Sequence, residues 1–171
     1  MAAVGGGYLW HMAHPDEADS ALTVTRETSA SRDQVWAVIA DGWTYSQWVV
    51  GNSRMRAVDP NWPAPGSTIH HSIGVWPLLL DDHTVVEDCQ PKRQLVLLAK
   101  GRPFGKARIT MRLEDTADGG CRIDMAEVPV GFPMGWIPER LALAAAVPRN
   151  RECTKRLAAI AERRPPSAVD Q

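Results

Sequence analysis

The alternation of apolar and polar residues in the second half of the chain constrains its fold more than any other sequence feature. Between residues 105 and 114, Ala107, Ile109, Met111 and Leu113 alternate with charged or hydroxyl side chains. Successive residues of a strand point to opposite faces, so this pattern predicts a strand with one covered face and one face in water. Such a strand needs a second apolar layer against its covered face.

A second alternating run follows the turn predicted at residues 118–120. Cys121, Ile123 and Met125 occupy its apolar side, and the two runs together indicate an antiparallel hairpin. Continuing the same period places Glu127 on the covered face. This carboxylate is therefore a candidate for chemistry inside the fold.

Further β-like runs occupy most of the chain after Gly51, separated by turn residues such as Pro, Gly and Asp. Short connections between consecutive strands favour an antiparallel meander. A shorter β-like run lies before Ser29. The strands predicted after Gly51 cover roughly 53–58, 67–75, 80–88, 93–100, 105–114 and 121–128.

Helices are predicted on both sides of this meander. The segment 31–34 reads Ser-Arg-Asp-Gln, a capping box that begins a helix, and a second short helix is expected after Gly42. An apolar stripe over 138–163 predicts a long C-terminal helix. Pro148 should kink or divide this helix, because proline lacks the backbone N–H and clashes with the preceding turn.

Length and charge limit the class of protein. The chain has 171 residues, of which 44% are hydrophobic and 23% charged, with a formal net charge of −1. This length suits one domain, and the near-neutral charge argues against a nucleic-acid partner. We interpret the basic residues between 149 and 164 as a solvated helix face. The apolar stretch 141–147 is far shorter than the ~20 residues that cross a bilayer, so no membrane span is expected.

The expected organisation is a single ligand-binding domain over residues 21–164. Residues 1–20 are glycine-rich and lack the features of a signal peptide, and we interpret them as a flexible tail in which Met12 is an alternative start. Residues 165–171 form a second short tail. The sequence does not indicate an oligomeric state.

The cysteines and histidines do not form a metal-binding pattern. Cys89, Cys121 and Cys153 are widely spaced and odd in number, which favours reduced thiols in a cytoplasmic protein. The adjacent His70 and His71 point to opposite faces of one predicted strand and cannot chelate one ion together. We expect neither a metal nor a cofactor.

Several segments resemble the START-like helix-grip superfamily, also called SRPBCC, and within it the polyketide cyclase/dehydrase-like proteins. The resemblance covers about residues 21–163 and identifies a fold rather than a reaction. The segments that carry it are Ser31–Trp36, Asp41–Trp48, Pro65–Ser67, Thr84–Glu87 and Arg102–Gly105.

The resemblance implies an α+β, START/Bet v 1-like architecture. A curved seven-stranded antiparallel sheet would wrap around the long C-terminal helix, with two short helices between strands 1 and 2. The space between sheet and helix would hold a lipid-, polyketide- or hormone-like molecule. Pro148 departs from the uninterrupted helix of this family.

His71 is the first candidate for chemistry. Ile69, His71 and Ile73 share the apolar face of one predicted strand. A partly buried imidazole there could orient a ligand oxygen or act as a general acid or base near neutral pH. The alternative is a structural histidine that hydrogen-bonds within the core.

Glu127 is the second candidate. In a dry cavity it could be a polar anchor, or a base whose pKa is raised by burial. The alternative is a solvated residue near the strand end that Pro129 marks.

These patterns lead to two leading hypotheses for function. The first is a carrier that binds a small hydrophobic molecule without catalysis; the second is a metal-independent cyclase or dehydratase in which His71 or Glu127 moves protons. A protein-partner module is a third hypothesis, without support from the sequence. Trp76 and Trp136 lie at element ends and are candidates for the cavity rim. The predicted cavity residues are Trp48, Ile69, His71, Ile73, Trp76, Ile109, Met111, Met125, Glu127, Trp136 and Leu141.

Overall fold

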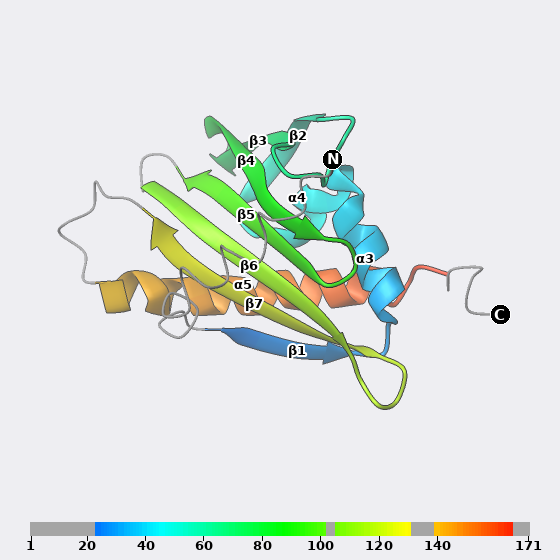
Figure 1. Ribbon diagram of the computed structural model, residues 1–171. Coiled ribbons are helices and arrows are strands. Elements are labelled where there is room, and N and C mark those ends of the chain that lie inside the picture. The colour runs from blue at the N-terminus through cyan, green and yellow to red at the C-terminus, as the bar shows by residue number, and fades with distance from the viewer. Residues whose placement is uncertain (1–22, 102–104, 131–138, 166–171) are drawn as a thin grey trace, which may run out of the picture.

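A seven-stranded antiparallel sheet and a long C-terminal helix dominate the structure (Figure 1). The computed structural model describes residues 23–101, 105–130 and 139–165. The predicted tail 1–20 and most of the tail 165–171 lie outside these residues. The strands are β1 (Val24–Thr28), β2 (Asn52–Val58), β3 (Thr68–Val75), β4 (Leu78–Gln90), β5 (Gln94–Gly101), β6 (Gly105–Asp115) and β7 (Cys121–Val130).

The strand order is β1-β7-β6-β5-β4-β3-β2, so β2 to β7 form a meander and β1 pairs with β7 at its end. All pairs are antiparallel. The predicted seven-stranded sheet with helices inserted between its first two strands is confirmed. The helices are α3 (Arg32–Ala40), the 3-10 turn η1 (Gly42–Thr44), α4 (Tyr45–Trp48) and α5 (Glu139–Ala161).

The predicted capping box begins helix α3. The Ser31 side chain accepts a hydrogen bond from the Gln34 backbone N–H at 3.3 Å, and the Gln34 side chain accepts one from the Ser31 N–H at 2.9 Å. Two N–H groups that the helix itself cannot satisfy are thus paired. Val35 and Val38 of α3 are fully buried, which fixes this helix against the sheet and α5.

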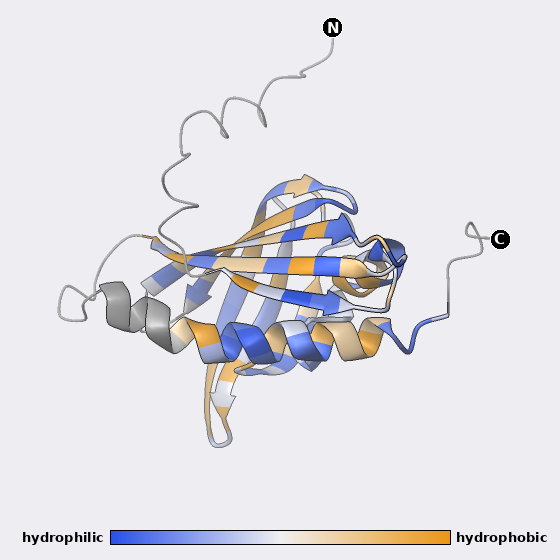
Figure 2. Cartoon of the chain, turned by 90° about the horizontal axis from the view of Figure 1, so that it is seen from below, coloured by the Kyte–Doolittle hydropathy of each residue, from blue (hydrophilic) through white to orange (hydrophobic). Residues whose placement is uncertain are grey.

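Helix α5 lies across one face of the sheet and contacts β1, β7, α3 and α4 (Figures 1 and 2). Leu157, on the side of α5 that faces the sheet, is fully buried. The prediction that Pro148 could divide this helix is wrong, because α5 runs through it without interruption. Pro148 lies on the exposed side of the helix, and an interior proline removes one backbone hydrogen bond while the neighbouring turns keep theirs.

The hairpin between β3 and β4 extends beyond the rest of the fold (Figure 2). Gly74 has a φ of +106°, and a Cβ at this position would lie 2.3 Å from the Leu78 carbonyl oxygen. Only glycine accommodates both the left-handed backbone and this close approach. The hairpin therefore turns tightly and carries its tip away from the core.

Candidate functional site

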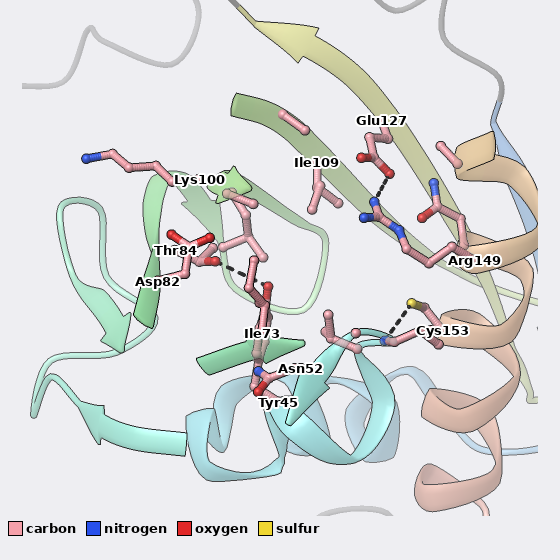
Figure 3. A pocket seen from close by; sticks show the side chains of 18 of the residues that line it. Tyr45, Asn52, Ile73, Asp82, Thr84, Lys100, Ile109, Glu127, Arg149 and Cys153 are labelled. Atoms are coloured by element: carbon pink, nitrogen blue, oxygen red, sulfur yellow. Dashed lines mark hydrogen bonds and ion pairs between the residues drawn. The ribbon is translucent and has the colours of Figure 1, made fainter. Parts of the chain in front are cut away.

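A cavity of about 430 Å³ lies between the sheet and the helices α4 and α5 (Figure 3). Its walls are largely apolar and include Leu97 and Ile109 from the middle of the sheet. The cavity-facing stripe of α5 contains Ala146, Asn150 and Cys153, which are spaced so that they share one side of a helix. Alternate side chains of the strands and the cavity-facing stripe of α5 together enclose this space.

His71 lies within a chain of polar contacts on one wall of the cavity. Its Nε2 is 3.0 Å from the Thr84 hydroxyl, which is in turn 3.3 Å from the Tyr45 hydroxyl. The Tyr45 and His71 rings have centroids 5.4 Å apart. Burial raises the pKa of Tyr45 to about 12, so its hydroxyl remains protonated and can donate a hydrogen bond.

Asp82 lies directly opposite His71 across the β3–β4 ladder. One carboxylate oxygen accepts a hydrogen bond of 2.7 Å from the His83 backbone N–H. The other oxygen, Oδ2, is buried without a hydrogen-bond partner, and so is Nδ1 of His71. Burial lowers the pKa of His71 below 6.5, although the negative charge of Asp82 opposes this shift. His71 is therefore a neutral imidazole at physiological pH.

Glu127 and Arg149 form an ion pair on the opposite wall (Figure 3). Glu127 is 9% exposed and projects from β7, whereas Arg149 reaches it from α5. Burial lowers the pKa of Arg149, but the charge and hydrogen bond of Glu127 outweigh it and leave that pKa raised. Glu127 therefore has a structural partner, which favours the role of polar anchor over that of a free base.

Buried polar atoms without partners are concentrated at the cavity. Seven buried side-chain nitrogen and oxygen atoms of the described residues have no hydrogen-bond partner, and five of them belong to residues that line the cavity. A buried polar atom without a hydrogen-bond partner lowers folding stability. The gathering of five such atoms at the cavity therefore makes these groups candidates for contacts with a ligand. The five atoms are Trp48 Nε1, His71 Nδ1, Asp82 Oδ2, and Nδ2 and Oδ1 of Asn150.

The predicted cavity residues fall into three groups. Ile69 and Met111 are buried in the core and do not line this cavity, and Trp76 is 81% exposed at the β3–β4 turn. Trp136 lies outside the described residues, as does the side chain of Leu141, although Leu141 belongs to α5. The predicted residues that do line the cavity are Trp48, His71, Ile73, Ile109, Met125 and Glu127.

The sequence interpretation missed several polar contributors, among them Tyr45, Asp82, Thr84, Arg149 and Asn150. Asp82 is the second of two aspartates after three leucines in β4, and an extrapolation of the His71 face across the ladder would have identified it. We interpreted the basic residues after 148 as a solvated helix face, yet Arg149 turns toward the sheet. The partner that draws it there, Glu127, is 22 residues away in sequence.

The described residues contain no cluster of three or more His, Cys, Asp or Glu side chains able to hold a metal ion. Cys89, Cys121 and Cys153 are free thiols. Burial raises the pKa of both Cys89 and Cys121 to about 11, and burial also raises that of Cys153. These thiols are therefore weak nucleophiles at neutral pH.

Residues 20–163 match a family model described as "Polyketide cyclase / dehydrase and lipid transport". This match spans the sheet, the short helices and α5 together. The chain belongs to this family. A search of curated proteins finds no match to the chain.

Solved structures place this member of the polyketide cyclase/dehydrase and lipid-transport family in the START-like, helix-grip fold. A START superfamily protein from Mycobacterium smegmatis is 16% identical, with a TM-score of 0.60 over 83% of this chain and 97% of the other. A putative uncharacterised protein from Rhizobium leguminosarum is 18% identical, with a TM-score of 0.64 over 85% and 95%. At these identities the likeness establishes the fold alone.

The family match spans all the elements that enclose the cavity. Among the described elements, no helix is long and apolar enough to cross a membrane. In this chain, polar side chains lie on two walls of a cavity whose centre is apolar.

Proposed function

We propose that the protein binds a small, largely apolar molecule in the cavity between the sheet and α5, and that polar groups on two opposite walls orient this molecule. The observation that carries the proposal is the concentration of unpartnered buried polar atoms in an otherwise apolar cavity. A volume of about 430 Å³ lies within the usual range for small-molecule sites, about 300–1,000 Å³.

The apolar walls supply the affinity for such a ligand. Leu97, Ile109 and Met125 line the middle of the cavity, and each Å² of apolar surface removed from water contributes about 25 cal/mol. Such contacts are not directional, so they hold the ligand without fixing its orientation. Orientation must come from the polar walls.

The unpartnered atoms define which polar groups the ligand carries. Asp82 Oδ2 only accepts hydrogen bonds and Trp48 Nε1 only donates them, whereas the amide of Asn150 does both. A ligand with a hydroxyl near Asp82 and a carbonyl or second hydroxyl near Asn150 would satisfy these atoms. A ligand whose only polar group is a carboxylate cannot donate to Asp82 and would be repelled by it.

Displacement of the fluorescent apolar probe N-phenyl-1-naphthylamine tests cavity binding. The variant Ala107→Phe places a ring in the cavity wall, and the matched control Ala126→Phe adds the same ring to the neighbouring strand at a position that does not line the cavity. We expect probe binding to fall at least about tenfold in Ala107→Phe and to persist in Ala126→Phe. Equal binding by both folded variants would remove the cavity as the site.

A rigid series of competitors tests the polar groups. We expect 4,4′-dihydroxybiphenyl to displace the probe more effectively than 4-hydroxybiphenyl, and biphenyl-4-carboxylate to be the weakest. The variant Asp82→Leu should reduce the preference for the hydroxylated compounds by about tenfold, while the apolar probe still binds. An unchanged order of competitors in Asp82→Leu would contradict the orienting role of this carboxylate.

Acid–base catalysis of the cyclase or dehydrase type is the second candidate function. It is favoured by the neutral, buried His71, whose Nδ1 has no partner and whose neighbour across the ladder is Asp82. A neutral imidazole can take up a proton that a nearby carboxylate then stabilises. The variants His71→Ala and Glu127→Gln separate the two functions: loss of turnover with retained ligand affinity supports catalysis, and unaltered turnover contradicts it.

A further inference from the structure

The tip of the β3–β4 hairpin exposes a group of large apolar side chains. Val75, Trp76 and Leu78 are each 81% exposed, and Leu80 is 48% exposed. The sequence from Ile73 to Leu80 contains no charged residue. Single exposed apolar residues are common, but a contiguous group at one protruding tip marks a surface that contacts an apolar partner.

The hairpin is joined to the neighbouring strand just before its tip. The Gly74 N–H donates a hydrogen bond of 3.3 Å to the Gly51 carbonyl, and the Ser53 hydroxyl donates to the Gly74 carbonyl. These bonds join the hairpin to the start of β2 and hold its tip away from the body of the protein (Figure 2). The exposed side chains therefore lie apart from the core.

The hairpin tip lies at the end of the sheet where some of the strand residues that line the cavity are found. In an antiparallel meander, alternate turns share an edge, so the β3–β4 turn and the ends of β5 and β6 lie at the same end of the sheet. Lys100 and Gly105, which line the cavity, belong to these ends. A surface bound by the tip would thus lie at the same end of the sheet as Lys100 and Gly105 of the cavity lining.

Unpaired cations surround this edge. Lys100 and Lys106 lie directly opposite each other across β5 and β6, and Figure 3 shows the Lys100 side chain extending away from the cavity. Arg54 lies opposite Ser72 near the base of the hairpin. None of the three forms an ion pair with the described residues. Although the net charge is −1, this edge is locally positive and complements an anionic surface.

The size and shape of the tip argue against a second copy of the chain as its partner. At about 200 Å² for a fully exposed large side chain, the four side chains expose roughly 600 Å², which is below the ~800 Å² that each partner of a standard interface buries. A protruding tip also offers no flat face for a symmetric contact. An apolar tip with a tryptophan and flanking cations instead matches the interface of a lipid bilayer.

We propose that the β3–β4 hairpin docks the protein on a lipid membrane surface. Val75, Trp76 and Leu78 enter the boundary between headgroups and acyl chains, and Arg54, Lys100 and Lys106 contact anionic headgroups. Docking turns the cavity edge toward the bilayer, from which an apolar ligand can pass. The contact itself requires no ligand, so it does not depend on the function proposed above.

Flotation with vesicles tests this proposal. The vesicles consist of phosphatidylcholine with or without phosphatidylglycerol, and the double variant Trp76→Ser/Leu78→Ser is compared with Trp43→Ser. Trp43 is also exposed, at 57%, but lies on η1. We expect the double variant to lose at least about tenfold in partition coefficient, Trp43→Ser to lose little, and Arg54→Glu to weaken binding only where phosphatidylglycerol is present.

Two controls keep the result unambiguous. Circular dichroism and binding of the apolar probe should be the same in wild type and double variant, because neither hairpin residue lines the cavity. The proposal is overturned if wild-type protein binds neither vesicle, or if the double variant binds as tightly as wild type. It is also overturned if the wild type is a dimer in solution that the double variant dissociates, because the tip would then contact a second copy.

Discussion

His71 shows how strongly the surroundings of one residue determine its chemistry. Burial, with a smaller contribution from the Arg56 charge, lowers its pKa below 6.5, and Asp82 only partly opposes this. The unfolded chain therefore binds a proton more readily than the folded one as the pH falls below 6.5. Folding stability contributed by the neutral ring is fully present above that pH and is lost as the pH falls through the depressed pKa.

We therefore expect His71→Gln to reduce the loss of stability between about pH 6.5 and 5. Urea denaturation at several pH values measures this, and His70→Gln is the matched control because His70 lies on the other face of the same strand. An NMR titration of His71 should show its midpoint below 6.5. A normal or raised midpoint would contradict the burial argument.

For single residues, the sequence predicts which face of the sheet a side chain occupies better than which residue it contacts. The period of two placed His71 and Glu127 on the covered side, and both are buried. It did not reveal that Thr84 bonds His71 or that Arg149 bonds Glu127, because these contacts depend on strand register and on how the helix is rotated. The same limit applies to Trp76, whose position at an element end did not distinguish the cavity rim from a protruding tip.

Among the elements, helix α3 offers the most direct test of a local sequence rule. Removing the Ser31 hydroxyl leaves the Gln34 backbone N–H without its hydrogen-bond acceptor. We expect Ser31→Ala to lower the free energy of unfolding by about 1 kcal/mol. Urea titration should show a lower midpoint with an unchanged slope, and an unchanged midpoint would show that the cap contributes nothing.

Element boundaries could be predicted closely wherever a local signal marks them. The observed β6 and β7, Gly105–Asp115 and Cys121–Val130, extend the predicted strands by one and two residues. The prediction that Pro148 divides α5 failed, because a local rule against helix was outweighed by the packing of the turns that follow it, including Cys153 and Leu157. Local sequence rules thus predict where helices and strands begin and end better than whether a helix continues through its interior, which depends on tertiary packing.

For the whole molecule, the cavity implies a conflict between stability and binding. Both polar atoms of Asn150 are buried without partners, so the free protein bears their desolvation cost. We expect Asn150→Leu to raise the free energy of unfolding by about 1 kcal/mol and to weaken binding of 4,4′-dihydroxybiphenyl relative to the apolar probe. Thermal unfolding and competition measure the two effects. A destabilised variant would contradict this explanation.

The pairing of β1 with β7 has a consequence for biosynthesis. Thr25 and Asp124, which are hydrogen-bonded across these strands, are 99 positions apart. While the ribosome is still translating the middle of the message, the first strand has no neighbour with which to form its ladder. Contacts this distant slow folding, so the nascent chain must wait for its last strand, and the β2–β6 meander can assemble first.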